Sequence, residues 1–141
     1  MRPAGARLHR GWPGWLLVAL ALNVTAAAVY GGVGLMTGTM AMDDSWLQTG
    51  PFHSWTLPGL ALLLTVALPQ ACLLVLAALG DRRAVLAGYL VGAGLILWIV
   101  VQLAVFRRFF VLQPIVVGFG VVELALAAWW ARRSIAAASR G

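Results

Sequence analysis

Residues 84–106 read AVLAGYLVGAGLILWIVVQLAVF, an apolar run that contains no charged residue. Asp81-Arg82-Arg83 precedes this run and Arg107-Arg108 follows it. About 20 mainly apolar residues are enough for an α-helix to cross the hydrocarbon core of a bilayer. No water is present there, so the backbone must satisfy its own hydrogen bonds, as a helix does. The run therefore predicts a membrane-spanning helix between two charged turns.

Three further apolar runs of similar length lie at residues 15–36, 57–79 and 109–130. The 141-residue chain is 62% hydrophobic and only 10% charged, whereas soluble domains carry about 25% charged residues. The short links between the last three runs require neighbouring helices to be antiparallel. We therefore expect an all-α fold, a four-helix transmembrane bundle with up-down-up-down topology, in which residues 1–141 form a single integral membrane domain.

The basic residues indicate how the bundle is oriented. All ten are arginines, and most lie in the N-terminal tail, the 82–83 turn and the C-terminal tail, whereas the long link at residues 37–56 carries Asp43 and Asp44 and no arginine. Cytoplasmic segments of membrane proteins are enriched in arginine and lysine. The distribution predicts an N-in/C-in protein of the cell membrane, in a bacterial plasma membrane, with an outer loop at residues 37–56. The positive charge is thus explained without nucleic acid as a partner.

The first helix has a second interpretation. An arginine-rich start, an apolar run and the small residues Ala26-Ala27-Ala28 also resemble a secretory signal with its cleavage site. The apolar run continues beyond them to Met36, which is longer than a usual signal core and favours a retained helix.

Three polar residues inside the apolar runs form a candidate intramembrane polar cluster. Glu123 is the only acid within a predicted span, and an ionisable group there is costly enough to be a functional hypothesis. At about 1.5 Å per residue, Asn23 lies at a similar depth on its own helix and Gln70 lies somewhat deeper on another. We expect Glu123 to face the interior and to pair with Asn23 or Gln70. The alternative to a functional role is interhelical hydrogen bonding that holds the bundle together.

Polar residues also flank the outer ends of the predicted helices. An anion or a lipid headgroup could bind them as an outer polar mouth, and ordinary interfacial anchoring is the alternative. The candidate residues are His53, Gln102, Arg107, Arg108 and Gln113.

The apolar run at residues 84–106 also contains a pattern of small residues that is typical of helix packing. Gly88 and Gly92, extended by Ala84, place small residues on one helical face. Such a face lets two membrane helices approach closely, either within the bundle or across a dimer.

Residue types that carry chemistry are sparse. The single cysteine, Cys72, excludes a cysteine pair, and two histidines cannot build a zinc site of the usual Cys/His kind. Methionines near the acids of the outer loop are spaced too loosely to indicate a copper site. No nucleophile, no metal site and no cofactor is predicted, and the sequence leans against an enzyme.

Several motifs between residues 51 and 128 resemble a group of small, uncharacterised four-helix integral membrane proteins of actinobacteria. They comprise Pro51-Phe52, the stretch Trp55-Thr56-Leu57-Pro58-Gly59, Gly94 with Trp98, Ile99 and Gln102, and Leu112-Gln113-Pro114 with Gly120. In size and plan the chain is loosely similar to DoxX-like membrane proteins. The resemblance implies the four-helix fold and brings no activity with it.

Three functional hypotheses follow. The first is a non-enzymatic accessory or interaction component of the membrane, whose partners are the lipid bilayer and either a second copy or another membrane subunit. The second is a small transporter or permeation unit that uses the polar cluster around Glu123. The third, a quinone-linked membrane redox helper, lacks a supporting motif.

Overall fold

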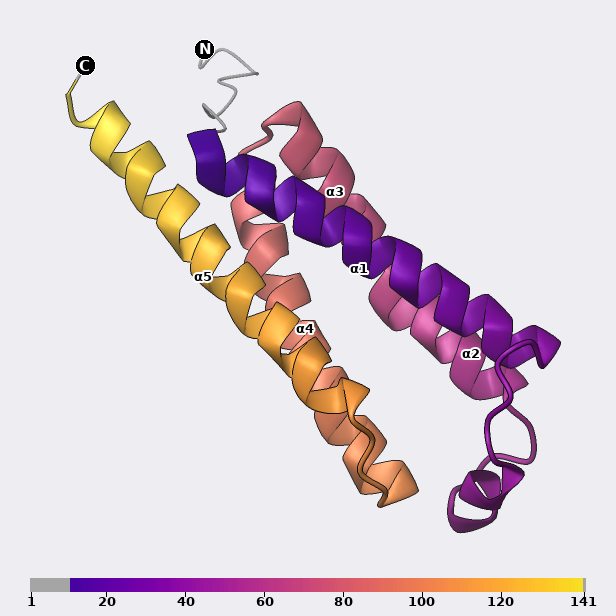
Figure 1. The fold of residues 1–141 in the computed structure, drawn as a ribbon. Helices are drawn as coiled ribbons and strands as arrows, with labels where there is room; N and C mark the ends of the chain where they lie inside the picture. Colours follow the sequence, from indigo (N-terminus) through magenta and orange to yellow (C-terminus); the bar gives the residue numbers. More distant parts are fainter. Residues whose placement is uncertain (1–10, 141) are drawn as a thin grey trace.

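The computed structural model describes residues 11–140, and this part of the chain is helical. Its elements are α1 (Gly11–Thr37), a short 3-10 helix η1 (Asp44–Thr49), α2 (Thr56–Leu62), a π-helical segment η2 (Leu63–Ala67), α3 (Leu68–Leu79), α4 (Arg83–Phe106) and α5 (Leu112–Ala138). Because α2, η2 and α3 continue one another, the chain forms four long helical rods (Figure 1).

Each of the four rods, with α2, η2 and α3 counted as one, is long and apolar enough to cross a membrane. This agrees with the four predicted spans, although three boundaries differ by more than one residue. The first helix begins at Gly11 instead of residue 15. The last helix begins at Leu112 instead of residue 109, and it continues to Ala138 instead of ending at residue 130. The late start has a local cause, since Arg107 ends α4 in a left-handed conformation with φ of 50° and the chain then needs a turn.

The arrangement of the rods places α3 and α5 diagonally opposite one another. α1 packs against the α2–α3 rod and against α5, while α4 packs against α5 and α3. The start of α1, the end of α5 and the turn between α3 and α4 lie at one end of the bundle, and η1 lies at the other end (Figure 1).

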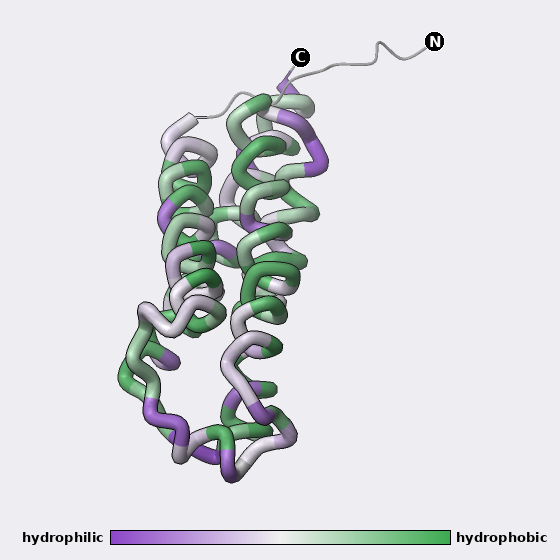
Figure 2. Tube along the Cα trace, turned by 90° about the vertical axis from the view of Figure 1, so that its right-hand side faces the viewer, coloured by the Kyte–Doolittle hydropathy of each residue, from purple (hydrophilic) through white to green (hydrophobic). Residues whose placement is uncertain are grey.

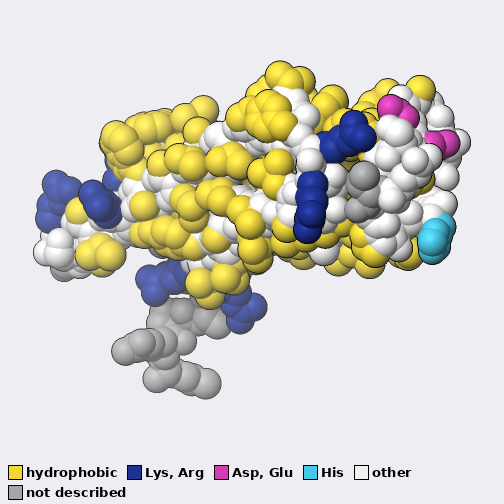
Figure 3. Space-filling view, turned by 90° about the horizontal axis from the view of Figure 1, so that it is seen from below, with side chains coloured by type: hydrophobic (Ala, Val, Ile, Leu, Met, Phe, Trp, Pro, Cys, Tyr) yellow, Lys and Arg dark blue, Asp and Glu magenta, His cyan; other side chains and the backbone are white. Residues whose placement is uncertain are grey.

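Most of the surface of the rods is apolar, as a lipid-facing exterior requires. Exposed leucines and valines occur along every rod, and hydrophobic colour covers the length of the bundle (Figure 2). In the space-filling view a hydrophobic belt lies between arginines at one end and a mixture of arginines, acids and the histidine toward the other (Figure 3). Such an exterior would be unfavourable in water. Together with the four long apolar helices, it indicates a small multi-pass membrane protein.

Two close approaches of glycines determine how tightly the rods pack. A Cβ on Gly92 would lie 2.8 Å from the backbone oxygen of Gly120, and a Cβ on Gly120 would lie 2.7 Å from the oxygen of Gly92. Gly32 of α1 and Gly59 of α2 face each other in the same way, at 3.0 and 2.6 Å. The small-residue face predicted on α4 therefore lies within the bundle, against α5.

The outer loop is tied to the ends of the helices by aromatic contacts. Trp55 stacks on Phe106 at a centroid distance of 6.0 Å, and Trp46 meets Phe110 edge-on at 6.0 Å. The indole N–H of Trp55 donates to Asp44 at 3.0 Å. These contacts form an ordered cap across the ends of α2, α4 and α5, which sequence patterns did not predict.

Candidate functional site

The strongest candidate site is a buried polar pair between Gln70 of α3 and Glu123 of α5. Nε2 of Gln70 donates to both carboxylate oxygens of Glu123, at 2.8 and 3.0 Å. Both side chains are 0% exposed. The inward orientation of Glu123 and its predicted contact with Gln70 are therefore present, and the contact joins the two diagonally opposed rods.

The pair lies between two hydrophobic clusters. Along the α2–α3 rod, Gln70 lies between Ala67 of one cluster and Leu73 of the other. Along α5, Glu123 lies between Phe119 and Leu126 in the same way. Apolar side chains therefore surround the two polar groups on both sides along the bundle axis. In such surroundings a hydrogen bond has no competition from water, so losing a partner is costly.

The local backbone around Gln70 is irregular. Pro69 stands in the first turn of α3, directly after η2. Proline lacks the N–H that would close the helical ladder, and its ring crowds the preceding turn. The wider π-helical turn at Leu63–Ala67 accommodates this interruption while the helix continues. Helical π segments are often associated with functional positions.

One atom of the pair has no partner. Within residues 11–140, Oε1 of Gln70 is buried and accepts no hydrogen bond. A primary amide carries donors and an acceptor, so Gln70 could bond a carboxylate through Nε2 or a protonated carboxyl through Oε1. The geometry therefore supports a hydrogen bond between α3 and α5 in which the Gln70 amide keeps an unused acceptor.

A groove of about 230 Å³ lies beside Gln70, between the α2–α3 rod and α4. Its lining is mainly apolar, and the polar groups on it are Thr65 and Gln70. Thr65 is already bonded to the backbone oxygen of Ala61 at 2.7 Å. Glu123 does not line the groove.

Asn23 does not join the polar pair, so the predicted three-residue cluster is wrong for this residue. Asn23 is exposed on the surface of α1. The rotation of α1 is set by its core residues Leu17, Ala21, Val24 and Ala28. Asn23 is turned about 100° from Val24, and it therefore faces away from the bundle.

The predicted outer polar mouth is not assembled as one site. Gln113 is buried in the first turn of α5 and bonds the turn that precedes it: its Oε1 accepts from the backbone N–H of Phe110 at 3.1 Å and its Nε2 donates to the oxygen of Arg108 at 3.3 Å. Gln113 therefore stabilises this turn instead of facing a ligand. The Arg108 guanidinium lies 6.0 Å from the ring centroid of Trp46, in the outer cap.

His53 lies apart from those residues. It lines a hollow of about 600 Å³ with Asp44 and the end of α1, and none of Gln102, Arg107, Arg108 or Gln113 lines that hollow. The mouth was inferred from positions near the outer ends of helices, and such positions do not specify the side of the bundle on which a residue lies.

In the outer loop, the carboxylate of Asp43 has a lowered pKa. The backbone N–H of Ser45 donates to its carboxylate at 2.8 Å and lowers the pKa of Asp43 below its usual value. Asp43 begins η1 in this way, so it stabilises the cap. Within the described residues, no three His, Cys, Asp or Glu side chains gather in a way that could hold a metal ion.

The predicted packing residues lie where a packing role requires them. Ala84, Gly88 and Gly92 are all buried on α4. A Cβ on Gly88 would lie 3.0 Å from the Cβ of Ala127, so the contact with α5 extends along the helix.

Comparisons with protein-family models, with curated proteins and with solved structures find no match. The structure itself defines the class of protein as a small four-helix membrane bundle with a buried polar pair in its core.

Proposed function

We propose that this protein is a non-enzymatic membrane component that works by associating with another membrane helix through the outer face of α1. The observation that carries the proposal is Asn23. It lies near the middle of α1, which runs from Gly11 to Thr37, and its side chain is exposed at a depth where the surroundings are hydrocarbon.

An amide in hydrocarbon favours association. Leaving a polar group without a hydrogen-bond partner in an apolar medium costs several kcal/mol by transfer measurements, and interhelical hydrogen bonds between membrane helices recover about 1–2 kcal/mol in model peptides. An asparagine carries both donors and an acceptor, so two copies related by a twofold axis can satisfy one another. A second copy is therefore the simplest partner.

The surroundings of Asn23 on the helix surface suit close packing. Ala19 and Ala27 lie one turn before and one turn after it, and both are exposed. Small residues at this spacing let two helix backbones approach. In the membrane we place the chain N-in/C-in, as the arginine distribution favours, in a bacterial plasma membrane.

The sealed core supports a structural role for Glu123. Gln70 and Glu123 are fully buried against each other, and the groove beside them stops at Gln70. A transport path would need water or substrate to reach Glu123. The pair is better suited to holding α3 and α5 in register, as a fixed scaffold for the interacting face.

Cysteine cross-linking in native membranes tests the association. In a Cys72→Ala background, Ala27→Cys places a thiol on the Asn23 face, and Val29→Cys places one about 120° away from Asn23 on the same helix. We expect oxidation to cross-link Ala27→Cys into dimers and to leave Val29→Cys monomeric. Adding Asn23→Leu to Ala27→Cys should lower the yield of the dimer severalfold.

The partner can also be a different protein. Co-purification in mild detergent, followed by mass spectrometry, would then recover a subunit that Asn23→Leu loses and Val29→Leu keeps. Absence of both a cross-link and an Asn23-dependent subunit would refute the proposal.

A small permeation or ligand-binding unit is the second candidate, and the groove beside Gln70 favours it. The unpartnered Oε1 of Gln70 and the irregular backbone at Pro69 are features seen at binding sites in broken membrane helices. Proton flux into vesicles that contain the purified protein separates the candidates. A structural tie should tolerate Glu123→Gln with no flux in either form, whereas a permeation unit should show flux that Glu123→Gln removes.

A further inference from the structure

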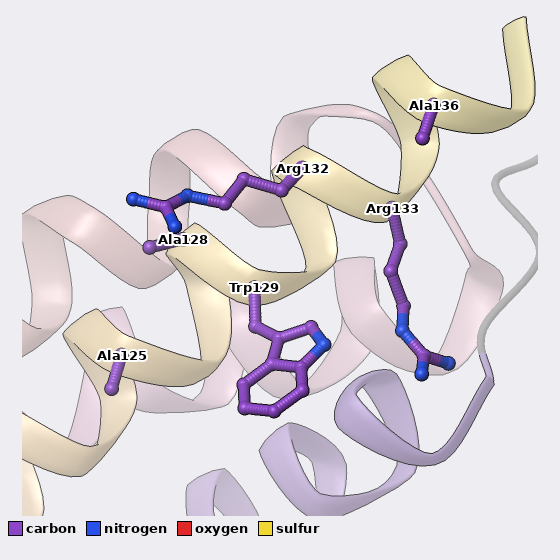
Figure 4. A pocket seen from close by; sticks show the side chains of 6 residues that line it. All are labelled: Ala125, Ala128, Trp129, Arg132, Arg133 and Ala136. Atoms are coloured by element: carbon purple, nitrogen blue, oxygen red, sulfur yellow. The ribbon is translucent and has the colours of Figure 1, made fainter.

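At the arginine-rich end of the bundle, the side chains of α5 form a hollow of about 560 Å³. Three alanines, Ala125, Ala128 and Ala136, leave room along the helix, and Trp129 with Arg132 and Arg133 completes the lining. In Figure 4 the Trp129 ring and the Arg133 side chain project toward the start of α1, while Arg132 extends along α5 past Ala128. The hollow thus combines an apolar floor, an aromatic wall and two guanidinium groups.

Part of this hollow is held in place by contacts with α1. The Arg133 guanidinium lies 5.7 Å from the ring centroid of Trp12, and Trp12 packs edge-on against Trp129 at 5.0 Å. A cation over the face of a tryptophan is attracted to it. Arg133 is therefore positioned before any ligand arrives, which reduces the entropic cost of binding.

The charge of the two arginines is not neutralised within the described part of the chain. Neither arginine forms an ion pair there, and the only acid at this end is Asp81, whose carboxylate accepts from the backbone N–H of Arg83 at 2.8 Å. Guanidinium groups bind phosphate oxygens through two parallel N–H donors. The guanidinium groups of the hollow, which form no ion pair with the described residues, are thus suited to bind a phosphate.

The position of the hollow selects one source of phosphate. It lies where the apolar surface of α5 gives way to exposed arginines, at the level that lipid headgroups occupy beside a spanning helix. We propose that Arg132, Arg133 and Trp129 form a binding site for an anionic phospholipid. The phosphate meets the Arg132 guanidinium, which extends past Ala128 (Figure 4), and an acyl chain lies over Ala128 and Ala125. Arg133 adds positive charge from the side of Trp12.

Native mass spectrometry of the purified full chain tests this site. Detergent-solubilised protein is titrated with phosphatidylglycerol and with phosphatidylcholine of the same acyl chains. We expect phosphatidylglycerol adducts to dominate about tenfold, and the double variant Arg132→Gln/Arg133→Gln to lose that preference, because each arginine near an anionic headgroup contributes appreciably. Arg107→Gln/Arg108→Gln removes the same charge at the other end and should change binding less than twofold.

Two further measurements separate a built site from general attraction. Ala128→Leu fills the hollow and leaves its charges in place, and Ala125→Leu does so at an exposed position; both should weaken phosphatidylglycerol binding severalfold. Soluble glycerophosphate should compete poorly, since it lacks the acyl chain. Equal losses from the two arginine double variants, no effect of either filling variant, or full competition by glycerophosphate would overturn the proposal.

Discussion

Gln70–Glu123 and Asn23 present the same physical problem at two places in the bundle. Each puts polar side chains inside an apolar span, where an unmet hydrogen bond is expensive. Gln70 and Glu123 meet each other in the core at 2.8 and 3.0 Å, whereas Asn23 faces outward and has no hydrogen bond to the described residues. The Gln70–Glu123 pair joins two helices of one chain, and we propose that Asn23 contacts another molecule.

The largest expected effect comes from breaking the internal pair. Glu123→Leu leaves the buried Gln70 amide without its partner and should lower the free energy of unfolding in micelles by about 2 kcal/mol. Gln70→Leu/Glu123→Leu removes both polar groups and should recover most of that loss. If the double variant were as unstable as the sum of the single variants, the pair would not be coupled.

Glu123→Gln is the matched control for that comparison. An amide has the same shape and can still accept from Nε2 of Gln70 and donate to its Oε1. We therefore expect its unfolding free energy to stay within about 1 kcal/mol of the wild type, measured by the same denaturation in micelles.

The next effect concerns the packing that holds α5, and with it Glu123, in position. Gly92→Val would bring a side chain into the backbone of Gly120, which cannot move aside as a flexible side chain could. Overpacking of this kind costs about 1–3 kcal/mol. Gly94→Val is the control on the same helix, because a Cβ at Gly94 meets nothing within 4 Å. Equal destabilisation by both variants would argue against the close α4–α5 approach.

Asn23→Leu should act on association and leave folding intact. The loss of one interhelical hydrogen bond, about 1 kcal/mol, corresponds to roughly fivefold weaker self-association. Energy transfer between labelled copies in vesicles measures this change. A drop in the stability of the isolated monomer, with association unaffected, would mean that Asn23 serves the fold after all.

The smallest effect lies in the aqueous cap, where water competes for the same kind of bond. The pKa of Asp43 is lowered in the folded protein, mainly by the backbone N–H of Ser45. A lowered pKa means that Asp43 stabilises the cap above the pKa of the unfolded chain and loses this effect as the pH falls through its folded value.

Amide exchange of η1 should therefore quicken slightly as the solution becomes acidic, after correction for intrinsic exchange. Asp43→Asn should remove most of that pH dependence, and an unchanged dependence would show that another group is responsible.

Sequence alone determined the four rods and the inward orientation of Glu123. An apolar run of this length has one favourable state in a bilayer, a helix with its backbone bonds satisfied internally, and an acid within it is driven away from lipid. The small-residue face of α4 was likewise predicted from the sequence. These features depend on the composition of a single segment and not on which other segments pack against it.

Only the tertiary structure decided which polar groups meet. Depth along a helix can be counted from its ends, but rotation about the helix axis is fixed by the packing of other residues. Because Leu17 and Ala21 pack in the core, Asn23 faces outward. Gln113 accepts a hydrogen bond from the backbone of Phe110, so it is not free to form an outer polar mouth. The contact of Arg133 with Trp12 likewise requires the end of α5 to lie beside the start of α1. The sequence of either helix alone does not predict this arrangement.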